Sequence, residues 1–468
     1  MADPTRPPPV RALAFLLPQF HPTPENDQFW GPGFTEWTNV VQAAPLFDGH
    51  QQPHLPADLG FYDLRLAETR LAQAALARAH GLHGFVYYHY WFGGRRLLHR
   101  PIDDVLASGA PDFPFCFCWA NENWTRRWDG LDAEVLVQQV YSADDDLAHI
   151  RWLARAFEDA RYIRVDGRPL FLVYRASRLP DAVATTQTWR EEARRLGIGD
   201  LYLCRVESFA TEKADPRTLG FDASVEFQPD WEHLGPPFRL GTHRVFDYAT
   251  AAARMLARVP PGHPRFPCVT PSWDNAARRR AGAHILHDSS PARYEQWLAD
   301  LLAAFTPPST DENFLFINAW NEWAEGNHLE PCQRWPRGYL EATARALAGH
   351  TTPDRAWKDF AARIATAPVP AGRQDDVVAA RMEALLAMYR DASRLLDAAD
   401  LPAARAMFTH VLNQALEMAP DLAGKACFKL ALIDRDGQRQ LLGRCLEVCP
   451  DHREARRLLA LLDAEGTR

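Results

Sequence analysis

Eight short apolar segments recur along the first three quarters of the chain and constrain its fold more than any other feature. Stretches of helical character separate most of them. The segments span residues 12–20, 83–91, 114–121, 168–175, 200–207, 223–228, 266–275 and 314–321. Strands that alternate with helices form a parallel α/β sheet, and eight of them in roughly 340 residues predict a (β/α)8 TIM barrel.

The main alternative is an open, doubly wound sheet. That fold usually carries a Gly-rich phosphate loop after its first strand. Here the first apolar segment runs into Pro-Gln-Phe-His-Pro at 18–22, and then into a long connection, 23–60, that contains several Trp, Glu and Asn residues. Long polar and aromatic loops are usually functional in compact domains. The barrel is therefore the expected fold.

The remaining quarter of the chain has a different character. We expect a disordered lead at 1–10, a barrel domain at 11–350, a linker at 351–376 and a small all-α domain at 377–468. Ala- and Leu-rich helical patterns fill this last domain, and Pro420 and Pro450 lie thirty residues apart, each followed by Asp. This spacing resembles a degenerate tetratricopeptide-type repeat. Such a unit serves either as a packing appendage or as a surface for a protein partner or self-association.

Composition excludes several classes of function. Hydrophobic residues make up 47% of the 468 positions and charged residues 24%, and the net charge is −8 without a Lys/Arg cluster, which argues against nucleic acid as a partner. The eight Cys are scattered, so we expect reduced thiols and a cytoplasmic location. The N-terminal MADPTRPPPVRA has no apolar core and no run in the sequence approaches eighteen apolar residues, so neither a signal peptide nor a membrane span is expected.

The last apolar segment ends in an unusual concentration of functional side chains. After Phe314-Leu-Phe-Ile the chain continues Asn-Ala-Trp-Asn-Glu-Trp-Ala-Glu-Gly-Asn-His-Leu-Glu. In a parallel barrel, side chains at the carboxyl ends of the strands converge on one solvent-accessible mouth. Trp rings pack against the apolar faces of sugars, while Asn and Glu bind their hydroxyl groups. This segment is therefore the predicted active site.

Two carboxyl groups carry the predicted chemistry. Glu322 lies at the strand end and Glu325 three residues later in the turn, so both can face one small volume. Two carboxyl groups in different environments separate into a general acid and a base, as glycosidic bond cleavage requires. The simpler interpretation is a solvated acidic pair in an ordinary loop.

Polar and aromatic residues at other strand ends are candidates for substrate binding. They are Gln19, His21, Trp37, Tyr88, His89, Trp91, Asn121, Glu122, Trp124, Trp273, Asp274, Trp320 and Asn321. Glu122 belongs to a second Asn-Glu-x-Trp-like segment and is the chief rival for a catalytic role. A single His at a strand end, such as His89, is more often a hydrogen-bonded structural residue than a catalyst.

We expect neither a metal nor another cofactor. His83 and His89 share one strand face, but no carboxylate or Cys completes a ligand set. The Asp run at 144–146 is similar to the metal-binding motif of nucleotide-sugar transferases. It opens a predicted helix, where carboxylates favour the positive end of the helix dipole, so a structural role is the simpler explanation.

Five long motifs together resemble one known family. They are AFLLPQFHP, FWGPGFTEWTNV, GFVYYHYWF, CWANENWTRRWDG and FINAWNEWAEGNHLEP, and the likeness covers about residues 10–348. The chain resembles the WbsX-like proteins, long labelled glycosyltransferases of bacterial surface-polysaccharide clusters and related to glycoside hydrolase family 99. The helical C-terminal region lies outside the resemblance.

The resemblance implies a specific chemistry. Enzymes of glycoside hydrolase family 99 are (β/α)8 barrels that cleave α-mannosidic linkages within chains with retention. By this likeness Glu322 would deprotonate the 2-hydroxyl to form a 1,2-anhydro sugar, and Glu325 would protonate the leaving oxygen and later activate water. A mannose- or rhamnose-type polysaccharide or oligosaccharide would be the substrate. A glycosyltransferase of O-antigen or capsule assembly and a non-catalytic sugar-binding scaffold remain alternatives.

Overall fold

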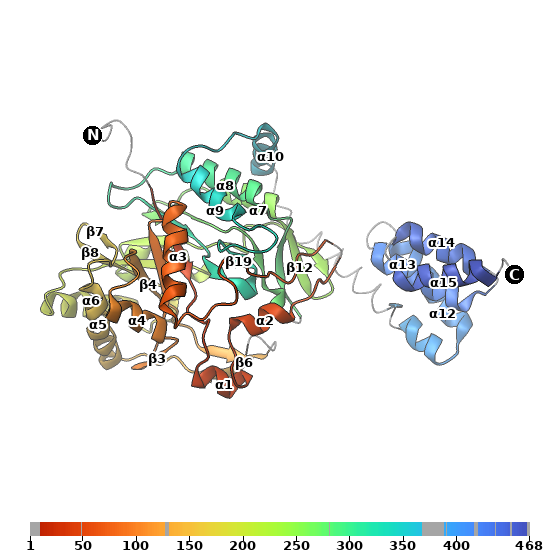
Figure 1. The fold of residues 1–468 in the computed structure, drawn as a ribbon, viewed down its shortest axis with the longest axis horizontal. Coiled ribbons are helices and arrows are strands. Elements are labelled where there is room, and N and C mark those ends of the chain that lie inside the picture. Colours follow the sequence, from red (N-terminus) through yellow and green to blue (C-terminus); the bar gives the residue numbers. More distant parts are fainter. Residues whose placement is uncertain are drawn as a thin grey trace. The chain divides into compact units, whose positions relative to one another are not determined.

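The structure is a computed structural model that describes residues 10–47, 49–126, 131–279, 281–366, 388–389, 391–415, 420–435, 437–449 and 452–465. It divides into two compact units, Met1–Val369 and Pro370–Arg468 (Figure 1). The first unit contains the predicted barrel and the second is all-α. The expected disordered lead lies, except for Val10, outside the described residues.

All eight predicted strands are present and parallel. In spatial order they are β13/β14 (Arg265–Phe266 and Cys268–Val269), β10 (Ala223–Glu226), β9 (Tyr202–Glu207), β8 (Arg168–Val173), β4 (Phe115–Trp119), β2 (Gly84–Phe92), β1 (Arg11–Leu16) and β17 (Phe314–Ile317). Read from β1 to β13/β14, neighbouring strands follow one another in chain order. The last strand, β17, closes the ring by pairing with β1 on one side and with β14 on the other. This is the strand order of a (β/α)8 barrel.

The barrel closes at one interrupted strand. β13 pairs with β10 through Ser224↔Arg265, while β14 pairs with β17 through Cys268↔Phe316. Pro267 separates the two halves, and its carbonyl accepts a hydrogen bond from Phe316 N at 2.9 Å. Because proline has no N–H, it breaks the ladder locally without opening the ring. The fold class predicted from the sequence is confirmed.

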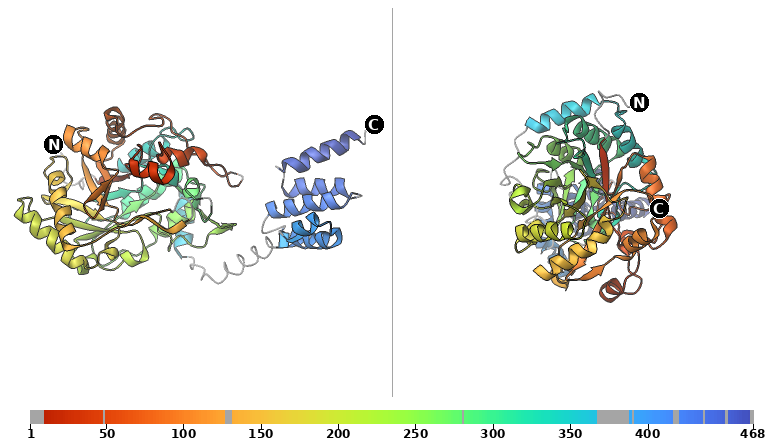
Figure 2. Two further views of the ribbon diagram at one scale, coloured as in Figure 1. Left: turned by 90° about the horizontal axis from the view of Figure 1, so that it is seen from below. Right: turned by 90° about the vertical axis from the view of Figure 1, so that its left-hand side faces the viewer.

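Helices cover the outside of the barrel, as Figure 2 shows. They are α3 (Ala67–Ala79), α4 (Arg100–Ser108), α5 (Ala143–Phe157), α6 (Ala182–Arg195), α7 (Tyr248–Leu256), α8 (Pro291–Ala304) and α9 (Gly338–Leu347). The β9–β10 crossover instead uses two 3₁₀ turns, η3 (Ala210–Glu212) and η4 (Pro216–Leu219). Inside the barrel, Phe15 packs against Tyr88, Phe227 and Phe316 at centroid distances of 5.6, 5.5 and 5.9 Å.

Insertions at the carboxyl ends of the strands build the mouth. They are α1 (Pro24–Trp30), α2 (Glu36–Gln42), β3 (Arg95–Leu97), the hairpin β5 (Trp124–Arg126) and β6 (Leu131–Val137), and the small sheet of β11 (Phe238–Leu240), β12 (His243–Asp247), β15 (Trp273–Asp274) and β16 (His284–His287). At the opposite end β7 (Arg164–Val165) pairs with β8. A TIM barrel carries its active site at the carboxyl end, where these insertions gather.

The boundary after the barrel differs from the sequence prediction. Part of the expected linker, 351–376, forms α10 (Arg355–Thr366), which packs against α7. Trp357 is buried there and its Nε1 donates to Asp300 at 2.8 Å. Burial of this aromatic side chain explains why the segment is a helix of the barrel unit. The rest of the expected linker, 367–376, lies outside the described residues.

The second unit is helical, as predicted. Its helices are α12 (Leu401–Ala415), α13 (Pro420–Ile433), α14 (Gln438–Val448) and α15 (Arg453–Glu465), and each packs against the next along the chain. Phe408, Val411, Cys427 and Leu442 lie in its core. Residues 377–387 and 390, at the start of the expected all-α domain, lie outside the described residues. No helix in the described parts of either unit has the length and apolar character needed to cross a bilayer.

Candidate active site

The segment after β17 forms a tight hairpin that positions both predicted carboxyl groups. β18 (Asn321–Glu322) pairs with β19 (Asn327–His328), and the turn η6 (Trp323–Glu325) joins them. Gly326 ends the turn at φ +56°, where a Cβ would lie 2.9 Å from Asp274 Cβ. A residue with a side chain would be strained at that φ and would clash there. The glycine thus allows Glu322 and Glu325 to belong to one compact turn.

An asparagine fixes this hairpin to the first strand of the barrel. Asn321 Oδ1 accepts from Leu17 N at 2.7 Å, and its Nδ2 donates to Leu17 O at 3.0 Å and to Tyr62 Oη at 3.1 Å. These contacts are fully buried, so the amide satisfies backbone groups that have no access to water. The backbone before Glu322 is therefore held on both sides.

A buried carboxyl group supports the hairpin from behind. Glu330 accepts from Tyr62 Oη at 2.7 Å, from Gln73 Nε2 at 2.7 Å and from Trp323 Nε1 at 2.6 Å. Burial raises the pKa of Glu330 to about 7, although these hydrogen bonds oppose the rise. Trp323 also stacks on His328 at a centroid distance of 3.8 Å. The hairpin is consequently fixed at both ends.

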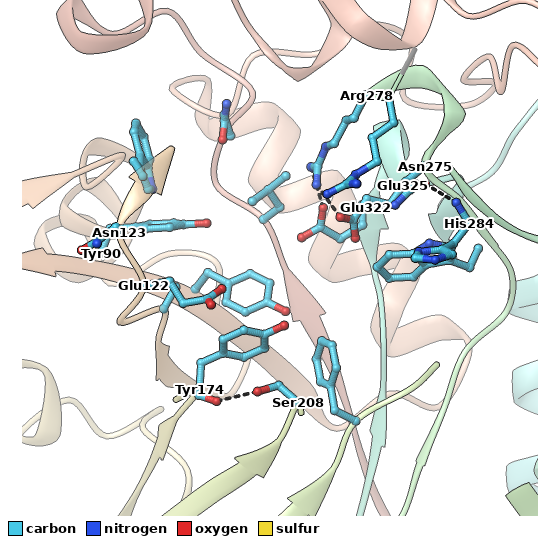
Figure 3. A pocket seen from close by; sticks show the side chains of 18 of the residues that line it. Tyr90, Glu122, Asn123, Tyr174, Ser208, Asn275, Arg278, His284, Glu322 and Glu325 are labelled. Atoms are coloured by element: carbon cyan, nitrogen blue, oxygen red, sulfur yellow. Dashed lines mark hydrogen bonds and ion pairs between the residues drawn. The ribbon is translucent and has the colours of Figure 1, made fainter. Parts of the chain in front are cut away.

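One arginine binds three carboxyl groups at this point. Arg278 Nη1 donates to Glu325 Oε1 at 2.6 Å, and Nη2 donates to Glu322 Oε2 at 2.9 Å and to Glu36 Oε1. Its Nε also donates to Glu36 Oε1 at 3.0 Å. Since the two η nitrogens belong to one guanidinium, Glu322 and Glu325 lie side by side, as Figure 3 shows.

The surroundings favour protonation of this carboxyl pair. Burial is the largest cause and raises the pKa of Glu322 to about 8; the Arg278 guanidinium opposes the rise, while the Glu325 and Glu36 carboxylates increase it. Burial likewise raises the pKa of Glu325. The Arg278 guanidinium lowers this pKa, and the Glu36 carboxylate raises it further. Three carboxylates around one cation would leave an excess of negative charge in a buried site, so the set retains a proton near neutral pH.

The carboxyl groups lie in the wall of a cavity of about 540 Å³ at the barrel mouth. In Figure 3, Glu322, Glu325, Arg278 and His284 lie on one side, and Tyr90, Glu122 and Tyr174 lie across the cavity from them. Trp231 stacks on His284 at 4.7 Å and meets Trp273 edge-on at 5.5 Å. Aromatic walls with a few polar groups are typical of a site for a small ligand or sugar.

Seven of the residues proposed from the sequence meet at this cavity. They are Gln19, Tyr88, Glu122, Trp124, Trp273, Glu322 and Glu325. The other eight lie outside its wall: His21, Trp37, His89, Trp91, Asn121, Asp274, Trp320 and Asn321. The cavity thus combines the predicted carboxyl pair with five of the thirteen expected binding residues.

Strand alternation explains two of the displaced residues. On β2, Tyr88 and Tyr90 line the cavity, whereas His89 and Trp91 face the helices outside. His89 Nε2 lies 3.0 Å from His149 Nε2, and Trp91 Nε1 donates to Asp145 at 2.9 Å. Successive side chains of a strand point to opposite faces. We expected ligand contact from these residues, and their packing against α5 removes them from the wall.

Polar residues among the other displaced ones hold backbone or side chains beneath the site. Asn121 Oδ1 accepts from Arg175 N at 2.8 Å. Asp274 accepts from His50 Nε2 at 2.6 Å and from Gln52 Nε2 at 2.7 Å. His21 Nδ1 lies 3.1 Å from the Pro18 carbonyl oxygen. These residues support the mouth without reaching the cavity.

The displaced tryptophans are packing residues. Trp37 donates from Nε1 to Tyr62 O at 2.9 Å and lies 5.4 Å from Trp323 between ring centroids. Trp320 is fully buried and packs against Phe85 at 5.0 Å. Both support the hairpin indirectly. The prediction that aromatic residues lie near the site is correct, but Trp37 and Trp320 are there because they pack in the core and not because they contact a ligand.

Several residues at the site were not predicted from the sequence. Tyr90, Trp231 and His284 line the cavity, Arg278 binds the carboxyl pair, and Glu36 orients Arg278. Glu36 lies within the FWGPGFTEWTNV motif, which could have pointed to it. Arg278 follows the seventh strand in an ordinary Arg-rich loop, and no local pattern marked it.

A metal site has little support in the described part of the chain. Asp230, Glu232 and His233 form the one group there whose ligand atoms are close enough to share an ion. Lys213 Nζ already donates to Asp230 at 2.9 Å and to Glu232 at 2.6 Å. An ammonium group thus occupies the position between these carboxylates, as expected for an ordinary ion-pair cluster.

The family assignment follows from the sequence match. The family model described as "Glycosyltransferase WbsX" matches residues 12–343, which include nearly the whole barrel and the hairpin of β18 and β19 that carries Glu322 and Glu325. The chain belongs to the WbsX family. Two curated relatives named WxcX, from Xanthomonas campestris pv. campestris strains B100 and ATCC 33913, are each 47% identical over 350 residues. Each match covers 72% of this chain and 50% of the relative, so the chain spans about half of their length.

Two solved structures align with this WbsX-family chain. An endo-alpha-mannosidase of glycoside hydrolase family 99 from Bacteroides thetaiotaomicron aligns at 13% identity and a TM-score of 0.47, over 75% of this chain and 98% of that one. A protein described as glycoside hydrolase-like aligns at 13% identity and a TM-score of 0.49, over 74% and 97%. The barrel assignment itself rests on the strand pairing described above.

Proposed function

We propose that this WbsX-family chain is a carbohydrate-active enzyme that cleaves glycosidic bonds of a bacterial surface polysaccharide or oligosaccharide. One observation carries the proposal: Glu322 and Glu325 share the guanidinium of Arg278 in the wall of an aromatic cavity at the barrel mouth. Two adjacent carboxyl groups in an aromatic, polar cavity are the equipment of a retaining glycosidase. The resemblance to proteins of bacterial surface-polysaccharide clusters supports polysaccharide as the substrate class.

The proposed reaction has two steps. One carboxylate removes the proton of the sugar 2-hydroxyl, whose oxygen attacks the anomeric carbon, while the other carboxyl group protonates the leaving oxygen. The second group, now ionised, then deprotonates water, whose oxygen attacks the anomeric carbon and opens the 1,2-anhydro ring. The first carboxyl group returns its proton to the 2-oxygen, so both groups end in their starting forms. An internal nucleophile has a high effective concentration. The reaction requires a 2-hydroxyl trans to the leaving group, as in an α-mannoside or α-rhamnoside.

The resemblance assigns the base to Glu322 and the acid to Glu325. Without substrate, Arg278 donates from Nη1 to Glu325, whereas its Nη2 is shared between Glu322 and Glu36, and this favours the proton on Glu322 instead. A bound sugar that hydrogen-bonds Glu322 through its 2-hydroxyl would favour the ionised form of that group. We therefore propose that substrate binding moves the proton from Glu322 to Glu325 before the first step.

The test incubates the parent protein and Glu325→Gln with mannose- and rhamnose-containing surface polysaccharides, with and without nucleotide sugars. We expect shortened chains from the parent alone, independent of nucleotide, and mass spectrometry identifies the products and linkage. Glu122→Gln is the matched control, because it removes a carboxylate from the opposite wall. Shortening by Glu325→Gln at the parent's rate would contradict the proposal.

A glycosyltransferase is the second candidate, and the description of the family model favours it. Growth of the polysaccharide that depends on a nucleotide sugar would establish that function in the same experiment. If the parent protein binds the polysaccharide, Glu322→Gln keeps the affinity, and neither cleavage nor growth occurs, the chain is a sugar-binding scaffold. In that case the helical unit would be the candidate surface for a protein partner.

A further inference from the structure

We propose that Arg278, oriented by Glu36, is a positioning residue that determines which of Glu322 and Glu325 carries the proton. The inference deepens the proposed function, because it concerns the same carboxyl pair. Two elements, α2 and the loop after β15, meet at the hairpin that carries Glu322 and Glu325. Glu36 comes from the first of these elements and Arg278 from the second.

The guanidinium contacts the two carboxyl groups unequally. Nη1 serves Glu325 with a bond of 2.6 Å, whereas Nη2 is divided between Glu322, at 2.9 Å, and Glu36. A charge-assisted hydrogen bond favours the ionised form of its acceptor, and it weakens when one donor nitrogen is shared. The geometry therefore favours the anion at Glu325 and the proton at Glu322.

Glu36 is placed to maintain this inequality. Its side chain is fully buried, and its Oε1 contacts both Nε and Nη2 of Arg278. Its Oε2 is buried without a hydrogen-bond partner among the described residues, so the hydrogen bonds of this carboxylate within that part of the chain come from the Arg278 guanidinium. Burying a carboxylate whose oxygens are not all hydrogen-bonded is costly, which argues that Glu36 has a specific role.

Other charged and titratable groups face the pair from the surrounding elements. Tyr88 and Tyr90 on β2 approach Glu322, and burial keeps the pKa of both phenols well above the ordinary value. Arg279, next to Arg278 in the loop, acts on Glu325 and favours its ionised form. Both tyrosines thus stay neutral in the pH range concerned, and Arg279 acts in the same direction as Nη1.

The test follows the two carboxyl groups directly, without substrate. The full chain is labelled with glutamate carrying ¹³C at the side-chain carboxyl carbon, and NMR spectra are recorded from about pH 4 to 10. Glu322→Gln and Glu325→Gln assign the two signals by their loss. In the parent we expect the titration midpoints of both carboxyl groups to lie above the ordinary Glu value. Glu322 should lose its proton last as the pH rises, because it shares Nη2 of Arg278 with Glu36.

Glu36→Gln is the deciding variant. It removes a nearby negative charge and replaces the charge-assisted bond to Nη2 with a weaker neutral one, so Nη2 binds Glu322 more strongly. The Glu322 midpoint should therefore fall by about one pH unit or more, and by more than that of Glu325. Arg278→Met should raise both midpoints. Glu122→Gln, whose carboxylate pairs with Arg175, is the control and should leave both unchanged. The isosteric Glu36 variant decides alone if Arg278→Met fails to fold.

The outcomes separate this inference from the proposed function. Equal shifts of both signals in Glu36→Gln, no shift, or a larger shift of Glu325 would overturn the role given to Arg278 and Glu36. A protein that cleaves no polysaccharide but shows the unequal shift refutes the proposed activity and retains the charge selection. An active enzyme without the unequal shift supports the proposed activity and refutes the charge selection by Arg278 and Glu36. In an active enzyme, Glu36→Gln should also displace the corresponding limb of the pH–rate profile to lower pH.

Discussion

Two strand ends of this barrel carry nearly the same sequence and form very different sites. After β4 the chain has Asn121-Glu122, and after β17 it has Asn321-Glu322. Both asparagines are fully buried amides that bind backbone, and both glutamates accept a hydrogen bond from an arginine, at 2.6 Å for Glu122 and 2.9 Å for Glu322. The local chemistry of the two segments is therefore alike.

The difference lies in burial and in the number of carboxylates that share a cation. The Glu122 side chain is 21% exposed, and its partner Arg175 binds one further carboxylate, Glu212. The Glu322 side chain is 8% exposed, and its arginine serves three carboxylates. A buried group with a smaller share of positive charge retains its proton to higher pH. Tertiary surroundings, rather than the motif, distinguish the candidate catalyst from its rival.

The largest expected effect is on catalysis. Glu322→Gln and Glu325→Gln should each lower kcat/KM by about 10³-fold or more, since each would remove a group that transfers a proton in the proposed reaction. Glu122→Gln should lower it less than about tenfold, chiefly through KM, because this side chain would contact substrate without transferring a proton. Steady-state kinetics on the polysaccharide found in the first experiment measures all three.

The ranking of these variants tests the comparison itself. If Glu122→Gln abolished turnover while Glu322→Gln remained active, the roles of the two strand ends would be exchanged. Thermal unfolding of each variant would show whether a loss of activity reflects a loss of structure. Glutamine preserves the shape of glutamate, so the barrel should remain folded in all three.

A second prediction concerns stability and pH. The folded pKa of Glu322, at about 8, lies above its ordinary value of 4.5, so the folded protein holds this proton more tightly than the unfolded chain does. The resulting stability is fully present below about pH 4.5 and is lost as pH rises through 8. Glu322→Gln cannot ionise, so it should be more stable than the parent by roughly 3–5 kcal/mol at pH 9 and nearly equal to it at pH 5.

Urea unfolding of the barrel unit at pH 5 and pH 9 measures this difference. Glu122→Gln is again the matched control, because it breaks a partly exposed ion pair and should be destabilised by about 0–1 kcal/mol. A Glu322→Gln variant that is less stable than the parent at pH 9 would show that Glu322 is ionised and well compensated in the folded state. The contrast between the two strand ends would then disappear.

The sequence predicted those parts of the molecule that depend on local patterns. Eight apolar segments identified the strands, and the Asn-Glu-Trp concentration after β17 identified the carboxyl hairpin, because strand length and the convergence of strand ends follow directly from backbone geometry. The helical region after the barrel was predicted from its periodicity. The α10 helix was not, because burial of Trp357 against the barrel unit decided its structure.

The remaining parts of the site depend on contacts between distant segments. Glu36 and Arg278 are more than two hundred positions apart in the chain, and nothing local links one to the other. His89 and Trp91 carried the right chemistry but occupied the outward face of β2, and the phase of a nearly continuous apolar strand is hard to read from sequence. The mouth of the barrel could be predicted from the types of residue at the strand ends. The charge balance of the carboxyl pair could be seen only in the folded structure, because distant segments supply Glu36 and Arg278.

The smallest expected effects separate the two asparagines. Asn321→Ala and Asn121→Ala each leave buried backbone groups without partners, those of Leu17 and Arg175, and should each destabilise the barrel by about 1–3 kcal/mol. Only Asn321 is joined directly to Glu322, so its loss should also reduce kcat of the folded enzyme, while Asn121→Ala should change kcat little. Unfolding in urea and kinetics on folded protein measure the two effects separately. An equal loss of kcat in both variants would mean that the β4 end positions the reacting groups as closely as the β17 hairpin does, since a backbone clamp affects turnover only through the groups that it holds in place.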